Sequence, residues 1–208
     1  MALKLNRKRN FQRMMAPPIA NRVIGKVKIF GPIMPASARS TQLRGVNPDK
    51  VLQKIKWAEN HGIKALIFEI NSPGGSVVPS KEIADAVKNT SMHTVAWVRD
   101  LAASGGYWIA SACDRIVADP MSGIGSIGVI SAYLEFSGLF KKYGVGYEGF
   151  KSGEYKDMGI PFRKPTQKEK SVIQDHIDNI HEKFVESVAE NRGLDSKKIQ
   201  KLATGRLY

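Results

Sequence analysis

Residues 64–98, KALIFEINSPGGSVVPSKEIADAVKNTSMHTVAWV, decide the fold class of this chain. The run KALIFEI is short and mostly apolar, which is typical of a strand buried on both faces of a sheet. NSPGGS ends that strand, VVPSKEIADAVKN continues with apolar residues at helical spacing, and HTVAWV is a second buried strand. This succession predicts an α/β domain with right-handed crossovers and a mainly parallel sheet.

The segments on either side continue this alternation. Residues 22–30 alternate apolar and polar side chains and stop at a Gly-Pro pair, which indicates a strand. Residues 47–62 predict a helix, with Asn47 as N-cap and Pro48 at the first helical position. Residues 115–119 predict another buried strand.

The C-terminal part of the chain is expected to be more irregular. Residues 126–136, SIGVISAYLEF, predict a strand that leads into a turn, and residues 137–144 predict a short helix. Residues 145–165 predict a loop with one brief strand. A long helix that ends at Gly193 follows, because Thr166 and Glu169 form a capping box and an apolar stripe typical of core packing comes next. The stripe consists of Ile173, Ile177, Ile180, Phe184 and Val188.

The composition suits a basic leader, residues 1–21, and one domain, residues 22–208. The net charge of +13 indicates attraction to acidic surfaces, although a solvated tail also explains the charge of the leader. The basic residues have no interleaved aromatic motif, which argues against specific nucleic-acid binding. The leader residues that could contact an anionic membrane surface are Lys4, Arg7, Lys8, Arg9 and Arg13.

Cys113 is the only cysteine, so no intrachain disulfide can form and nothing requires an oxidising compartment. We expect it to pack as a small buried side chain. No run approaches the ~18 to 20 apolar residues of a membrane span, and the N-terminus lacks the apolar region of a signal peptide. These patterns predict a soluble cytoplasmic or membrane-peripheral protein.

Two glycine-rich segments, NSPGG (residues 71–75) and AASGG (residues 102–106), each follow a predicted strand. Ligands bind beyond the carboxyl ends of parallel strands, so both segments can face one cleft. Ser104 precedes a glycine pair, which is compatible with a tight turn, a close helix contact, or a backbone that approaches a ligand.

Neither a cofactor nor a metal is expected. GIGSIG, residues 123–128, matches a dinucleotide-binding pattern, but it leads into a strand-like segment and opens no helix. AASGG is also similar to a nucleophile elbow, which would require a histidine base. His176 and His181 lie on different faces of one predicted helix, and their spacing also disfavours a metal pair.

A lysine is therefore the remaining candidate base for Ser104. A neutral amine can accept the hydroxyl proton when burial disfavours the ammonium form, and lowering a lysine pKa from ~10.4 to ~7.5 requires about 4 kcal/mol. The loop KSGEYKDMGIP offers Lys151 and Lys156.

Four motifs lie in a distinctive order: INSPGGSV, DLAASGGYWIASACDRIVADP, GSIGV and FKSGEYKDMGIPFRKPT. In this order and spacing they resemble the signal peptide peptidase A family, peptidase family S49, whose members use a Ser/Lys dyad within the Clp protease/crotonase superfamily. The resemblance covers about residues 23–208. It implies a fold of repeated β-β-α units, with a mainly parallel sheet flanked by helices.

The resemblance also implies the roles of individual residues. Ser104 would be the nucleophile, and Lys156, the second lysine of the K-S-G-x-x-K pattern, the general base. The backbone N–H groups of Gly75 and Gly105 would form the oxyanion hole, and Ser126 would orient the lysine. Peptide amides aimed at a developing oxyanion are each worth roughly 3 kcal/mol in a water-poor site.

The function implied is a serine endopeptidase that cleaves signal peptide remnants, or other short hydrophobic or unfolded polypeptides, through an acyl-enzyme. Relatives with one copy of the fold assemble into rings whose sites use residues from neighbours, which implies a homo-oligomer. Bacterial members usually carry a membrane anchor, where this sequence has the basic leader, so a soluble enzyme near a membrane surface and a chain trimmed of its anchor both stay open. Larger members contain two tandem copies of the fold, whereas this sequence has one. The family pattern continues beyond TGRLY, so we expect a C-terminal truncation.

Two other hypotheses remain open from the sequence. A crotonase-type acyl-CoA enzyme would share the fold and the two-amide oxyanion hole, but would use acidic catalytic residues and would not need Ser104. A non-catalytic oligomeric scaffold or membrane-surface adaptor would use the basic leader and would leave Ser104 unreactive towards serine-directed reagents.

Overall fold

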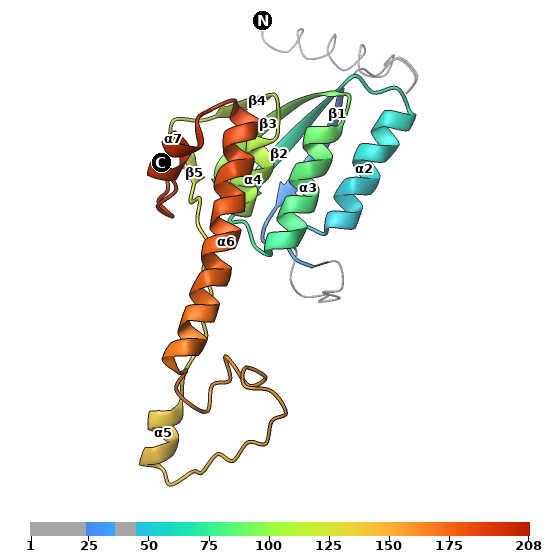
Figure 1. Ribbon diagram of the computed structural model, residues 1–208. Helices are drawn as coiled ribbons and strands as arrows, with labels where there is room; N and C mark the ends of the chain where they lie inside the picture. Colours follow the sequence, from blue (N-terminus) through green and yellow to red (C-terminus); the bar gives the residue numbers. More distant parts are fainter. Residues whose placement is uncertain (1–23, 36–44) are drawn as a thin grey trace, which may run out of the picture.

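A parallel sheet forms the centre of the molecule (Figure 1). The computed structural model describes residues 24–35 and 45–208. The strands lie in the order β1-β2-β3-β4, and β5 pairs with the C-terminal end of β3; every pair is parallel. Their bounds are β1 (Ile24–Phe30), β2 (Ala65–Ser72), β3 (His93–Ala103), β4 (Arg115–Ala118) and β5 (Gly123–Gly125).

The basic leader, with Lys4, Arg7, Lys8, Arg9 and Arg13, lies outside the described residues. Its expected contact with a membrane surface, and the division of the chain into a leader and one domain, stay predictions. Within residues 24–35 and 45–208, no helix is both long enough and apolar enough to cross a bilayer.

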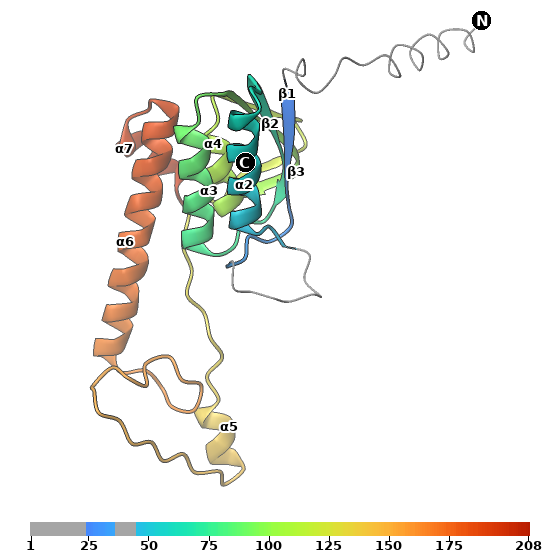
Figure 2. The same ribbon diagram turned by 90° about the vertical axis from the view of Figure 1, so that its right-hand side faces the viewer.

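Helices cover one face of the sheet. Figure 2 shows α2 (Pro48–Asn60), α3 (Val77–Asn89) and α4 (Gly105–Ser111) on the same side of the strands, with α6 (Gln167–Arg192) outside them. The alternation of strands and helices confirms the predicted α/β class with its mainly parallel sheet. The largest fully buried side chains between these layers include Phe68, Ile70, Ile83, Ile109 and Phe184.

Local capping signals set the helix ends as predicted. The Asn47 side chain accepts a hydrogen bond from the backbone N–H of Lys50 at 3.1 Å, which begins α2. Thr166 and Glu169 form both hydrogen bonds of a capping box at the start of α6. Gly193 ends α6 in the left-handed conformation with φ of 60°.

Strand β3 is longer than its apolar run predicts. It continues from the predicted end at Val98 to Ala103, because its last residues pair with β5, and Ala102 pairs with Ser72 of β2 after an irregularity in register. As a result, Ser104 follows directly on a central strand.

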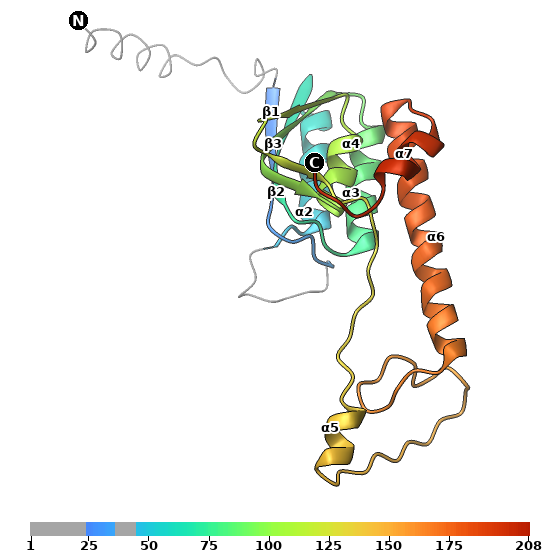
Figure 3. The same cartoon turned by 90° about the vertical axis from the view of Figure 1, so that its left-hand side faces the viewer.

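Residues 129–166 leave the sheet and form an arm with α5 (Ser137–Lys142) near its tip (Figures 1 and 3). The strand predicted at residues 126–136 is wrong, because this segment has no strand partner and only Ile127 in it is buried. The brief strand predicted within residues 145–165 is also wrong. The chain here is extended without being part of a sheet.

The apolar stripe of α6 serves two purposes. Phe184 and Val188 are buried in the core, as predicted. Ile173, Ile177 and Ile180 are only half-buried, because the N-terminal half of α6 runs beside the arm and beyond the sheet (Figure 1). Core packing is therefore confirmed only for the C-terminal half of this stripe.

The C-terminal residues complete the pairing of β5. After α7 (Ser196–Leu202), the backbones of Tyr208 and Ile124 exchange two hydrogen bonds, each of 2.9 Å. The carbonyl of Arg206 accepts a hydrogen bond from the N–H of Ser126 at 2.8 Å. Strand β5 is thus bound on both sides.

The Cys113 thiol is buried, as expected, with 1% of the residue exposed. Burial, and then the Asp114 carboxylate, raises the pKa of this thiol to about 12. Because the thiolate is the reactive form, we expect Cys113 in the native protein at pH 8 to react with a disulfide reagent more than about 100-fold slower than in denaturant. Rapid labelling of the folded protein would contradict this burial.

Candidate active site

Ser104 has an unusual backbone conformation at the junction of β3 and α4. Its φ and ψ are 50° and −121°, a region that a non-glycine residue occupies only when its surroundings hold it there. Two hydrogen bonds do so: its N–H donates to the carbonyl of Gly125 at 2.8 Å, and its carbonyl accepts from the N–H of Trp108 at 2.9 Å. Strained residues of this kind concentrate at functional sites.

The NSPGG turn lies directly against the start of α4. A Cβ at Gly74 would be 2.6 Å from the amide nitrogen of Gly105 and 2.9 Å from the Ser104 Cβ, so only glycine permits this contact. A Cβ at Gly75 would be 2.1 Å from the carbonyl oxygen of Ile33. The two glycine-rich segments therefore meet at one edge of the sheet, as their positions after β2 and β3 predicted.

Among residues 24–35 and 45–208, the backbone N–H groups of Gly75 and Gly105 donate to no backbone or side-chain acceptor. Gly105 is the first residue of α4, where a backbone N–H has no partner within the helix. Both glycines line the same groove as Ser104.

This groove has a volume of about 660 Å³ and a largely apolar wall. Trp108 forms part of the wall and is held by stacking on Phe184, with ring centroids 4.3 Å apart. Its indole N–H donates to the Ser187 hydroxyl at 2.8 Å, so its polar atom is satisfied. Val77 and Ile177 also line the groove, which suits it to apolar side chains.

Ser126 lines the groove as well and is the second serine with positive φ, at 51°. Its N–H is bound to the carbonyl of Arg206. The structure thus brings together four of the residues singled out from the sequence: Ser104, Gly75, Gly105 and Ser126.

Lys156 does not line this groove. It is exposed and belongs to the turn at residues 154–159 of the arm, which all three ribbon views place away from α4 (Figures 1, 2 and 3). The other candidate, Lys151, donates from its Nζ to the Asp157 carboxylate at 2.6 Å. Within one copy, the described residues bring no lysine to Ser104.

Sequence reasoning missed the contribution of α6 and of the C-terminal segment to the groove. Ile177, Asp178 and His181 line it from α6, and Ala203 lines it from the end of α7. His181 Nε2 lies 3.1 Å from the Ala203 carbonyl oxygen and is occupied by that hydrogen bond. The apolar stripe of α6, which extends beyond the residues buried in the core, was the sequence signal that could have indicated this contribution. In the described ranges, no cluster of His, Cys, Asp or Glu is suited to hold a metal ion.

Comparisons with solved structures identify the fold. The chain is similar to a mutant of ClpP1 from Listeria monocytogenes, with a TM-score of 0.55 at 17% identity, over 88% of this chain and 80% of that one. It is also similar to the 1510-N membrane-bound stomatin-specific protease, with a TM-score of 0.54 at 18% identity, over 88% of this chain and 70% of that one. The fold is Clp protease-like.

Comparisons of sequence identify the family. A protein of Enterococcus faecium named for signal peptide peptidase SppA is 39% identical over 160 residues, which is 76% of this chain and 46% of that protein. Protease 4 of Haemophilus influenzae is 30% identical over 190 residues, which is 89% of this chain and 30% of that protein. The chain thus spans less than half the length of either relative.

Two family models match in overlapping regions. The model described as Clp protease matches residues 43–120, and the model described as peptidase family S49 matches residues 86–208, which include Ser104, Ser126 and Lys156. On this match and on the identity to its relatives, the chain belongs to peptidase family S49.

Proposed function

We propose that this protein is a serine endopeptidase in which Ser104 is the nucleophile and Lys156 the general base. The observation that carries the proposal is the placement of Ser104: a strained serine lies at the start of α4, beside two glycine amides without acceptors and in the wall of an apolar groove. These are the parts that acyl transfer requires, namely a nucleophile, oxyanion donors and a binding site for the chain.

The base is proposed to come from a second copy of the chain. The arm that carries Lys156 exposes many large apolar side chains, which a soluble surface rarely displays unless a partner covers them. The resemblance to the signal peptide peptidase A family also implies that members with one copy of the fold build their sites from neighbouring subunits. The most exposed of these arm residues are Ile130, Leu134, Tyr143 and Phe150.

The proposed reaction follows from these positions. The Lys156 amine accepts the proton of the Ser104 hydroxyl as Oγ attacks the scissile carbonyl carbon. The N–H groups of Gly75 and Gly105 stabilise the oxyanion, and its collapse breaks the C–N bond as Lys156 returns the proton to the leaving amine. Lys156 then activates a water that hydrolyses the acyl-enzyme and releases Ser104. Ser126 orients the lysine.

The groove supports apolar peptides as substrates. Trp108, Ile177 and Val77 offer apolar surface beside Ser104. A groove with this lining suits an extended hydrophobic chain, such as a short or unfolded segment or a signal peptide remnant. No cofactor has a part in this reaction.

Ser104→Ala and Lys156→Met should each abolish hydrolysis of a fluorogenic hydrophobic peptide, because each variant lacks one member of the dyad. If the base comes from a neighbour, mixing the two inactive variants under subunit exchange should restore up to about a quarter of wild-type activity, since about one site in four then combines an intact serine with an intact lysine.

Labelling with a serine-directed fluorophosphonate probe gives a second readout of Ser104 and Lys156. It should label wild-type Ser104, fail to label Ser104→Ala, and label Lys156→Met at a greatly reduced rate. Undiminished hydrolysis in either variant would remove the corresponding residue from the mechanism, and a mixture that stays inactive would contradict the base from a second copy.

Ile177→Asp should weaken binding of apolar substrates, because it puts a charge into the groove at a half-buried position. We expect KM for a hydrophobic peptide to rise about 10-fold or more with little change in Tm. Val172→Asp is the matched control, since Val172 lies on the same helix and does not line the groove. An equal rise in KM in both variants would argue against the groove as the substrate site.

A further inference from the structure

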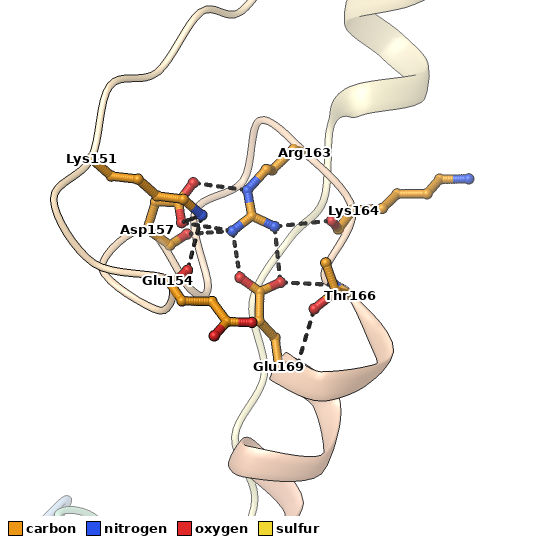
Figure 4. A network of polar contacts seen from close by, with 7 residues as sticks. All are labelled: Lys151, Glu154, Asp157, Arg163, Lys164, Thr166 and Glu169. Carbon is orange, nitrogen blue, oxygen red and sulfur yellow. Dashed lines mark hydrogen bonds and ion pairs between the residues drawn. The ribbon is translucent and has the colours of Figure 1, made fainter.

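We propose that Arg163 is a positioning residue for the base: it fastens the loop that carries Lys156, residues 151–158, to the first turn of α6. This inference rests on the proposed role of Lys156. It is drawn from a network of ion pairs between the arm and the first turn of α6, shown in Figure 4, in which one guanidinium joins two carboxylates.

Glu169 is the fixed end of this network. It is the third residue of α6 and is only 2% exposed, although most of the arm is open to solvent. Its Oε2 accepts a hydrogen bond from the N–H of Thr166 at 2.7 Å, and its own N–H donates to the Thr166 hydroxyl at 3.2 Å. The capping box therefore determines where this carboxylate lies.

Arg163 connects Glu169 to Asp157 through hydrogen bonds from all of its guanidinium nitrogens. Its Nη1 and Nη2 donate to the Glu169 carboxylate at 2.9 and 2.5 Å, and its Nε and Nη2 donate to the Asp157 carboxylate at 2.9 and 2.8 Å. Nη1 also donates to the carbonyl of Lys164 at 3.2 Å. The five N–H groups of a guanidinium are all used, in a planar geometry that a lysine cannot reproduce.

Asp157 is the other end of the network and is held by Arg163. It follows Lys156 in the chain and also accepts from Lys151, whose Nζ donates in addition to the carbonyl of Glu154 at 2.9 Å. The ion pair between Lys151 and Asp157, drawn in Figure 4, joins the two ends of the segment of sequence that contains Lys156. In the part of the chain that the structure describes, the Lys156 side chain has no ion-pair partner, whereas Lys151 pairs with Asp157. Of the two candidate lysines of the loop, Lys156 is therefore the one available to act as a base.

The carboxylates of Asp157 and Glu169 stay ionised at the near-neutral pH of an activity assay. Hydrogen bonds from Arg163 lower the pKa of Glu169 from its ordinary 4.5 to about 2, and hydrogen bonds from Arg163 and Lys151 lower the pKa of Asp157. A carboxylate with a lowered pKa contributes stability above its ordinary pKa and loses it as the pH falls towards the folded value. The network thus stays intact near neutral pH, and the Asp157 carboxylate stays bound to Arg163 and Lys151.

Arg163→Met should lower kcat about 10- to 100-fold and leave KM within about twofold, since a displaced base slows chemistry and the groove is untouched. Arg163→Lys should recover only part of the loss, because an ammonium cannot join both carboxylates. Lys168→Met is the matched control: it removes an exposed cation of the first turn of α6, 3.6 Å from Glu154, and should behave as wild type.

Hydrogen–deuterium exchange supplies a readout that does not depend on activity. In Arg163→Met, amides of residues 151–163 should exchange faster, while those of β2 and β3 stay as slow as in wild type; Lys168→Met should change neither. Glu169→Gln, which breaks the other end of the bridge, should reproduce the effect and serves if Arg163→Met folds poorly.

The outcomes separate this inference from the proposed function. Unchanged exchange in residues 151–163, or faster exchange with full kcat, overturns the positioning role of Arg163 while Ser104 and Lys156 keep theirs. If Ser104→Ala or Lys156→Met retains activity, the proposed function fails instead, and the exchange data alone decide whether Arg163 fastens the loop.

Discussion

The close contact between the NSPGG turn and the first residue of α4 is the constraint on which the site depends. Gly74 leaves no room for a side chain between itself and Gly105, and Gly75 leaves none beside Ile33. This spacing requires β2 and β3 to be neighbours that end at the same edge. The strained backbone of Ser104 can persist there because its N–H donates a hydrogen bond to the carbonyl of Gly125 in β5 and α4 begins at the next residue.

Those parts of the fold that depend on local signals could be predicted from the sequence. Asn47 at the start of α2, the capping box of Thr166 and Glu169, and Gly193 at the end of α6 each act within a few residues, and each lies where the pattern placed it. The meeting of the two glycine-rich segments was also predictable, because parallel strands of adjacent βα units end at one edge whatever their loops contain.

Other features depend on which segments become neighbours. Residues 126–136 have the pattern of a strand, but an extended segment becomes a strand only beside a partner, and here β3 pairs with residues 123–125 instead. In the same way, the stripe of α6 could not reveal that Val188 is buried in the core while Ile177 lines a groove. The resemblance supplied Lys156 as a candidate, but no local pattern states that its loop lies on an arm, remote from α4.

The arm also has a consequence for control of the activity. The core that carries Ser104 folds around its own apolar centre, whereas the arm buries few of its side chains against its own chain. On the proposed assembly, a solitary copy is folded but idle, and hydrolysis begins only when copies meet. Such a protease needs no inhibitor to remain harmless when scarce, because mass action makes its own concentration the switch.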